Sequence, residues 1–117
     1  MKKRSRLTAR AQYVAVYESG HAQVDQFIVM RVMRNGLDVS RLGFSVTKNV
    51  GKAVVRNRVR RLLKEATRVF EIKPGYDIVF IARSRCVAAS YNQILNSIER
   101  LISRIRVPVD KNEAVSA

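Results

Sequence analysis

Apolar residues along this chain follow two periods, one typical of helices and one typical of strands. Helical spacing of apolar side chains predicts three helices, at residues 7–19, about 52–70 and 90–106. Short runs rich in branched and aromatic side chains predict three strands, at residues 27–33, 37–47 and 76–82. The order α-β-β-α-β-α indicates an α+β sandwich in which helices pack on one small mixed sheet.

Turn residues and the two ends of the chain complete the expected architecture. Asn35-Gly36 is a strong hairpin signal, so we expect the first two strands to pair with each other in antiparallel fashion. A length of 117 residues suits a single domain, residues 1–117. Residues 1–6 predict a basic N-terminal arm, and residues 107–117 predict a flexible tail.

Positive charge is concentrated in one segment. The chain has 23 lysines and arginines against 9 carboxylates, a net charge of +14. From Lys48 to Arg68 there are eight basic residues and one acid, so this segment carries half of the net charge. Such a concentration of one sign favours a polyanion as partner.

The spacing of these charges is further evidence for a polyanionic partner. Arg56, Arg60 and Lys64 recur every fourth residue of the expected second helix, where like charges destabilise the helix. A bound polyanion would offset this repulsion. Arginine forks suit bidentate phosphate contacts, and Asn57 adds an uncharged donor and acceptor. The mixture favours structured RNA, with DNA as an open alternative.

Enzymatic chemistry finds little support in the sequence. The pair Gly51-Lys52 does not belong to a phosphate-binding loop, because Val46 and Ala53 occupy positions that the motif reserves for Gly and for Ser or Thr. The carboxylates are dispersed, and His21 is the only histidine, so we expect no catalytic residues and no metal site. Cys86 is the only cysteine and is interpreted as a small buried apolar residue.

Membrane insertion is not expected either. The longest apolar run, near residues 76–82, is far shorter than the roughly 20 residues that span a bilayer. We therefore expect a soluble, cytoplasmic protein.

Two tyrosines stand out on the first helix. Tyr13 and Tyr17 are four residues apart, so their rings share one face. Two interpretations are open: the rings pack into the core, or they stack on unpaired bases.

Three segments together resemble a known family. Residues 43–66, GFSVTKNVGKAVVRNRVRRLLKEA, are similar to the signature of the bacterial ribonuclease P protein component. The opening Arg6-Leu7-Thr8 and the segment YDIVFIAR at 76–83 fit the same family, and the likeness covers most of the chain before Val107. Tyr13 and Tyr17 stand where the family usually has phenylalanine, Met30 where an aromatic is frequent, and Asn49 where a second lysine is common.

The resemblance implies a fold and a role. It implies a left-handed βαβ crossover, against the usual right-handed preference. It implies that the chain is the protein subunit of a ribonucleoprotein endonuclease that matures the 5′ end of transfer RNA, and that the RNA subunit performs hydrolysis with its own magnesium ions. No cofactor bound by the protein alone and no obligate protein partner are expected. The alternative functions are a ribosome-associated or general RNA chaperone and, third, a DNA-binding architectural protein.

The resemblance also implies two sets of contact residues. The residues expected to bind the catalytic RNA are Lys48, Lys52, Arg56, Asn57, Arg58, Arg60, Arg61, Lys64 and Arg68. The residues expected in a cleft for the 5′ leader of precursor transfer RNA are Tyr13, Tyr17, Phe27 and Met30.

Overall fold

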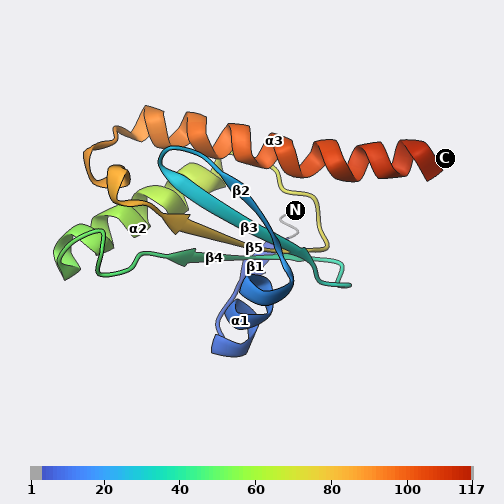
Figure 1. The fold of residues 1–117 in the computed structure, drawn as a ribbon, viewed down its shortest axis with the longest axis horizontal. Helices are drawn as coiled ribbons and strands as arrows, with labels where there is room; N and C mark the ends of the chain where they lie inside the picture. The colour runs from blue at the N-terminus through green and yellow to red at the C-terminus, as the bar shows by residue number, and fades with distance from the viewer. Residues whose placement is uncertain (1–3, 117) are drawn as a thin grey trace.

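A five-stranded mixed sheet with helices on both faces forms the protein (Figure 1). The computed structural model describes residues 4–116, and it describes side chains for residues 5–105. The elements in chain order are β1 (Arg4–Arg6), α1 (Arg10–Ser19), β2 (His21–Val24), β3 (Ile28–Arg34), β4 (Ser40–Ser45), α2 (Ala53–Arg68), β5 (Tyr76–Ala82), the 3-10 helix η1 (Ser84–Ala88) and α3 (Tyr91–Ser116). The expected α+β class is confirmed.

The most apolar strand, β5, lies in the middle of the sheet. The strand order is β1-β4-β5-β3-β2, with β5 parallel to β4 and antiparallel to β3. Ile78, Val79 and Phe80 are all fully buried, so β5 is covered on both faces. Such a strand is most stable when both of its edges are also paired.

The expected hairpin between the first two strands is therefore wrong. The Asn35-Gly36 turn forms, with Gly36 in the left-handed region at a φ of 72°. The strands on either side of it, β3 and β4, nevertheless do not pair with each other, because β5 lies between them. The segment β4–α2–β5 is a βαβ unit with parallel neighbouring strands, and its left-handedness stays a prediction.

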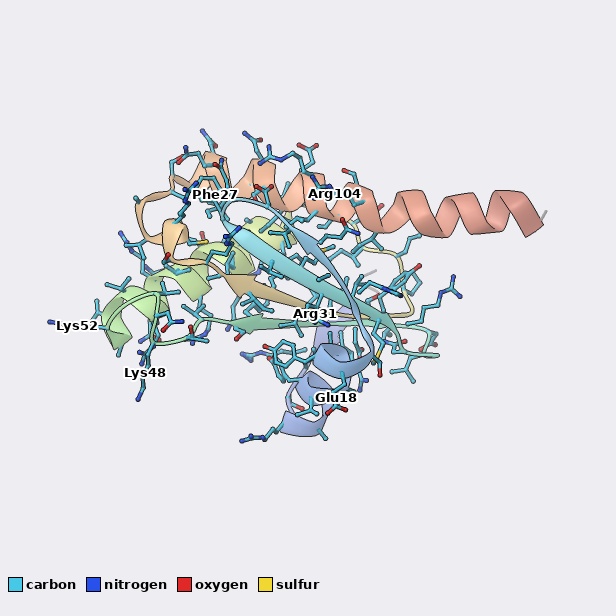
Figure 2. The ribbon with its side chains drawn as sticks, viewed as in Figure 1. Glu18, Phe27, Arg31, Lys48, Lys52 and Arg104 are labelled. Carbon is cyan, nitrogen blue, oxygen red and sulfur yellow. The ribbon has the colours of Figure 1, made fainter. Side chains whose placement is uncertain are left out.

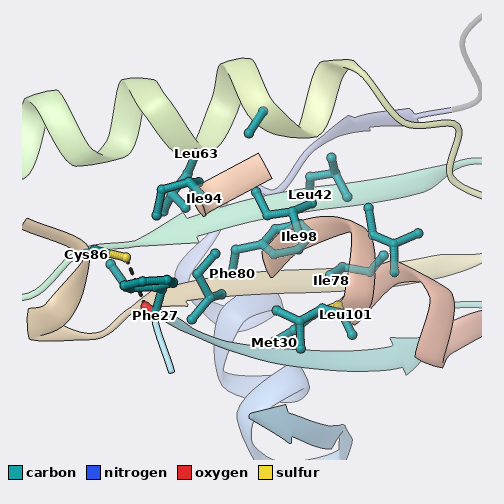
Figure 3. Close-up of a cluster of buried hydrophobic side chains, with 14 of the residues drawn as sticks. Phe27, Met30, Leu42, Leu63, Ile78, Phe80, Cys86, Ile94, Ile98 and Leu101 are labelled. Atoms are coloured by element: carbon teal, nitrogen blue, oxygen red, sulfur yellow. Dashed lines mark hydrogen bonds between the residues drawn. The ribbon is translucent and has the colours of Figure 1, made fainter. Parts of the chain in front are cut away.

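The sheet has a separate apolar layer on each face. Side chains of Ile78 and Phe80 join the larger core with α2 and α3 (Figure 3). Val79 and Ile81 point to the other face and pack with Leu7, Val16 and the ring of Tyr13 beneath α1. The two tyrosines of α1 and the basic helix α2 thus lie on opposite sides of the sheet.

Cys86 packs in the larger core as expected. It is 1% exposed, and its thiol donates a hydrogen bond to the carbonyl oxygen of Phe27 at 2.9 Å (Figure 3). Burial raises the pKa of the Cys86 thiol to about 11. At neutral pH the thiol is protonated and unreactive.

Both ends of the chain differ from expectation. Residues 4–6 form the edge strand β1, parallel to β4, whereas residues 1–3 of the expected arm lie outside the described residues. The third helix does not end near Arg106 but runs to Ser116, beyond the rest of the protein (Figure 1). A proline such as Pro108 removes one helical hydrogen bond and can bend a helix without ending it. The flexibility of residues 107–117 stays a prediction.

Across the described residues, no helix combines the length and the apolar character that crossing a membrane requires.

Candidate nucleic-acid interface

Helix α2 presents the basic segment. It starts at Ala53, after a turn in which Gly51 adopts a φ of 155°, a value that favours glycine. Val59, Leu63 and Ala66 are buried against the core. This apolar stripe fixes the orientation of α2 and leaves the basic residues on its other sides.

Two arginines of this face are held by local hydrogen bonds. Arg56 Nη1 donates to the carbonyl oxygen of Gly51 at 3.1 Å, and Arg60 Nη1 donates to Asn57 Oδ1 at 3.0 Å. Asn57 therefore orients an arginine, a role that the sequence did not indicate. A guanidinium held in place loses less side-chain entropy when it binds a phosphate.

The other basic residues lie around Arg56 and Arg60. Figure 2 shows Lys48 and Lys52 pointing away from the protein at the N-terminal end of α2. Arg61 and Arg68 are exposed as well. Arg58 points to the opposite edge of the helix, where its Nη2 donates to the carbonyl oxygen of Val87 at 3.1 Å. All nine residues predicted to bind RNA thus lie on α2 or on the turn before it, although they do not form one plane.

Among the described side chains, the cations of α2 are not in ion pairs. Within the part of the chain with described side chains, the ion pairs are Arg41–Asp77 and Arg100–Asp25, and neither involves a residue of α2. Partial burial and the charges of Arg6, Arg60 and Arg68 lower the pKa of the Lys64 ammonium. Burial is the larger cause, and the remaining part reflects repulsion by the neighbouring cations, which a bound anion would relieve.

The two tyrosines of α1 have different environments. The Tyr13 ring packs against Gly43 and the small core on that face, and its hydroxyl donates to the carbonyl oxygen of Leu7 at a long 3.5 Å. The Tyr17 side chain is 39% exposed. Of the two open interpretations, core packing describes Tyr13, whereas Tyr17 keeps an accessible ring.

Phe27 and Met30 pack away from these tyrosines, and their contact with the leader stays a prediction. Phe27 is 8% exposed and Met30 is 0% exposed, and both pack in the larger core beneath α3 (Figure 3). Alternate residues of a strand point to opposite faces, so Met30 points to the same face as Ile28 and away from α1. The structure therefore does not place Phe27 and Met30 with Tyr13 and Tyr17.

A residue outside the predicted leader contacts lies beside α1 instead. Arg31, next to Met30 in β3, reaches the C-terminal end of α1 (Figure 2). Its Nη2 donates to the carbonyl oxygens of Tyr17 and Gly20 at 2.7 and 3.2 Å. A cation at this end of a helix is stabilised by the partial negative charge of the last carbonyls. The alternation along β3 was the signal that could have identified it.

Carboxylates are dispersed in the structure as in the sequence. Asp77 accepts two hydrogen bonds from Arg41, and Asp25 accepts two from Arg100. Among the described residues, no three or more His, Cys, Asp or Glu side chains come together in a group that could hold a metal ion.

A small, basic α+β domain that presents a cationic helix belongs to the class of nucleic-acid-binding proteins. The family model Ribonuclease P matches residues 1–106, and the chain belongs to this family.

Individual relatives agree with this assignment. The ribonuclease P protein component of Thermoanaerobacter sp. strain X514 is 46% identical over 95 residues, which cover 80% of this chain and 82% of that protein. The solved structure of the Staphylococcus aureus RNase P protein has a TM-score of 0.75 at 31% identity, and the match covers 90% of this chain and 95% of the other. The Thermotoga maritima RNase P protein gives a TM-score of 0.77 at 28% identity, covering 85% and 96%.

Proposed function

We propose that this chain binds the catalytic RNA of ribonuclease P through α2 and contacts the 5′ leader of precursor transfer RNA beside α1. In this proposal the RNA subunit cleaves the substrate and binds the magnesium ions, and the holoenzyme acts in the cytoplasm. The observation that carries the proposal is the row of cations on α2, which lacks a carboxylate partner among the described side chains.

The geometry of α2 supports contact with an RNA backbone. Arg56, Arg60, Lys64 and Arg68 are each one helical turn apart, or about 6 Å along the axis. Each arginine can make a bidentate contact with a phosphate, and such contacts depend on backbone position rather than on base sequence. Contacts of this kind are appropriate for a folded RNA that is recognised by its shape.

The position of α1 supports a separate contact with the leader. Because α1 lies on the opposite face of the sheet from α2, one molecule can contact two RNA segments at once. The accessible ring of Tyr17 can stack on an unpaired nucleotide regardless of its base. Arg31, which bonds to the end of α1, adds positive charge on the same face.

The environments of the remaining reactive groups favour a positioning role for the protein. The Cys86 thiol is buried and protonated, and Asp77 is held by Arg41. His21, the single histidine of the sequence, is exposed at the start of β2.

A cleavage assay at varied magnesium concentration tests the proposal. The purified chain should lower the magnesium concentration that its cognate RNA needs to cleave precursor transfer RNA. The Arg56→Ala/Arg60→Ala variant should require more protein for the same effect. If the chain leaves the magnesium requirement unchanged and co-sediments with ribosomes instead, the ribosome-associated alternative replaces this proposal.

A further inference from the structure

A cavity opens between strand β1 and helix α2, and the function proposed above does not account for it. Its volume is about 360 Å³. The residues around it include Arg6, Leu42, Phe44, Lys64, Thr67 and Arg68. The cavity thus combines three cations with an aromatic ring.

The three cations come from two elements that only the fold brings together. Lys64 and Arg68 are one turn apart on α2, and Arg6 faces them from β1. Parallel pairing places Arg6 beside Leu42, and the Leu7 amide donates to the Leu42 carbonyl oxygen at 2.9 Å. The charge of Arg6 contributes to the lowered pKa of Lys64. No carboxylate is among the described residues that line the cavity.

Leu42 and Phe44 give the cavity an apolar part of its lining. Phe44 is half-buried and stacks on the fully buried Phe80, with ring centroids 5.7 Å apart and an interplanar angle of 17°. Leu42 lies beside Phe44 in the lining. Because Phe80 supports Phe44 from the core, the ring can offer apolar contact to a ligand without rearranging.

Cations and an aromatic ring in one cavity match the chemistry of a nucleotide. A phosphate would satisfy the three cations but would leave the apolar lining and most of the volume unused. Ligand pockets usually start at about 300 Å³, so the cavity is large enough for more than a phosphate ion. A planar base gains about 1–3 kcal/mol from stacking on an aromatic side chain.

We propose that this cavity binds one nucleotide of the RNA, with its phosphate held by Arg6, Lys64 and Arg68 and its base or sugar against Phe44. The proposal rests on the function proposed above, because it takes RNA as the partner. It adds a site on the β1 side of α2 and gives β1 a role in completing that site.

An NMR titration of the isotope-labelled full chain tests the site directly. The probes are inorganic phosphate and adenosine 5′-monophosphate, added in separate experiments. Both should give saturable shifts at the amides of Arg6, Phe44 and Lys64. The nucleotide should bind at least about five-fold more tightly than phosphate, which corresponds to the lower limit for stacking. Shifts centred elsewhere, or equal affinity for both probes, would overturn the proposal.

Two variants and a control separate charge from stacking. Arg6→Ala should weaken the binding of both probes. Arg10→Ala removes one exposed charge at the start of α1 and should leave the binding of both probes unchanged. Phe44→Leu should reduce the affinity for the nucleotide to that for phosphate. If Phe44→Leu does not fold, the affinity ratio in the unmutated chain and the effect of Arg6→Ala decide the question. Equal effects of Arg6→Ala and Arg10→Ala would count against the site.

Binding to the catalytic RNA distinguishes failure of this site from failure of the proposed function. If Arg56→Ala/Arg60→Ala weakens RNA binding while the nucleotide shifts lie elsewhere, the function stands and the cavity proposal is lost. If the same double variant binds the RNA as tightly as the unmutated chain, the proposed function fails. The titration then still decides whether the cavity binds nucleotides.

Discussion

The ring of Tyr13 on α1 lies directly against Gly43 on β4. A methyl group added at position 43 would stand 2.7 Å from both Cε1 and the hydroxyl oxygen of Tyr13. Real side chains do not approach so closely, so the glycine allows α1 to rest on the sheet. This contact belongs to the packing beneath the helix that also carries Tyr17.

Gly43→Ala should therefore displace Tyr13 and destabilise the protein. Overpacking of this kind costs about 1–3 kcal/mol in the free energy of unfolding. In a Tyr13→Leu background, Gly43→Ala should lower the free energy of unfolding much less, or even raise it. The reason is that alanine is more favourable than glycine within a strand. Urea denaturation of the four proteins measures the coupling. Additive effects of the two substitutions would contradict the contact.

Tyr17 and Tyr13 should affect substrate binding in different ways. Tyr17→Leu should weaken binding of precursor transfer RNA that has a leader by about 1–3 kcal/mol for each stacked base, because the accessible ring is lost. Binding of mature transfer RNA, which has no leader, should hardly change. Tyr13→Leu should mainly lower the thermal stability.

Holoenzyme affinities for the two ligands test this difference. The Tyr13→Leu protein is the matched control, because it loses the same type of side chain from the same helix. Equal losses for both ligands in the Tyr17→Leu protein would leave the leader contact without support.

The basic face of α2 should control the salt dependence of RNA binding. Arg56→Ala/Arg60→Ala removes two charges from the helix surface, so the slope of log affinity against log salt should flatten by roughly 0.7–0.9 for each lost phosphate contact. A matched control is Arg34→Ala/Arg104→Ala, which removes two exposed charges outside α2. An unchanged slope in the α2 variant would mean that this face is only solvated.

The ion pair between Arg41 and Asp77 should make stability depend on acid pH. Burial by itself would raise the pKa of Asp77, but the hydrogen bonds from Arg41 and Asn35 outweigh it, and the pKa lies below its ordinary value of 3.8. The ionised carboxylate therefore stabilises the fold fully above about pH 3.8, and this contribution is lost as the pH falls through the lower folded pKa.

Asp77→Asn should remove this pH dependence. Arg41 Nη2 donates to Asp77 Oδ2 at 2.7 Å, and the Asp77 side chain is 1% exposed. Loss of the charge should therefore also lower the free energy of unfolding by about 1–3 kcal/mol near neutral pH. Urea denaturation from pH 3 to pH 7 measures both effects. Asp38→Asn, at an exposed site, is the control. An equally steep acid transition in Asp77→Asn would contradict the role of this pair.

Features that depend on local spacing could be predicted from the order of residues. The helical period places Val59, Leu63 and Ala66 on one side of α2 and the cations on the others, and the structure has the same arrangement. Asn35-Gly36 likewise marks a turn, because its backbone preference is local. The burial of Cys86 followed from its apolar character.

Contacts between distant segments could not be predicted in this way and are known from the fold. The turn at Asn35-Gly36 does not reveal that β5 separates β3 from β4, since a strand can pair with any suitable edge. Met30 could have pointed to either face of the sheet, and the choice depends on which helices cover each face. Strand β1 has three polar residues and no apolar pattern, so its own residues do not predict its pairing with β4. For that reason no local signal brings Arg6 beside Lys64, or Tyr13 against Gly43.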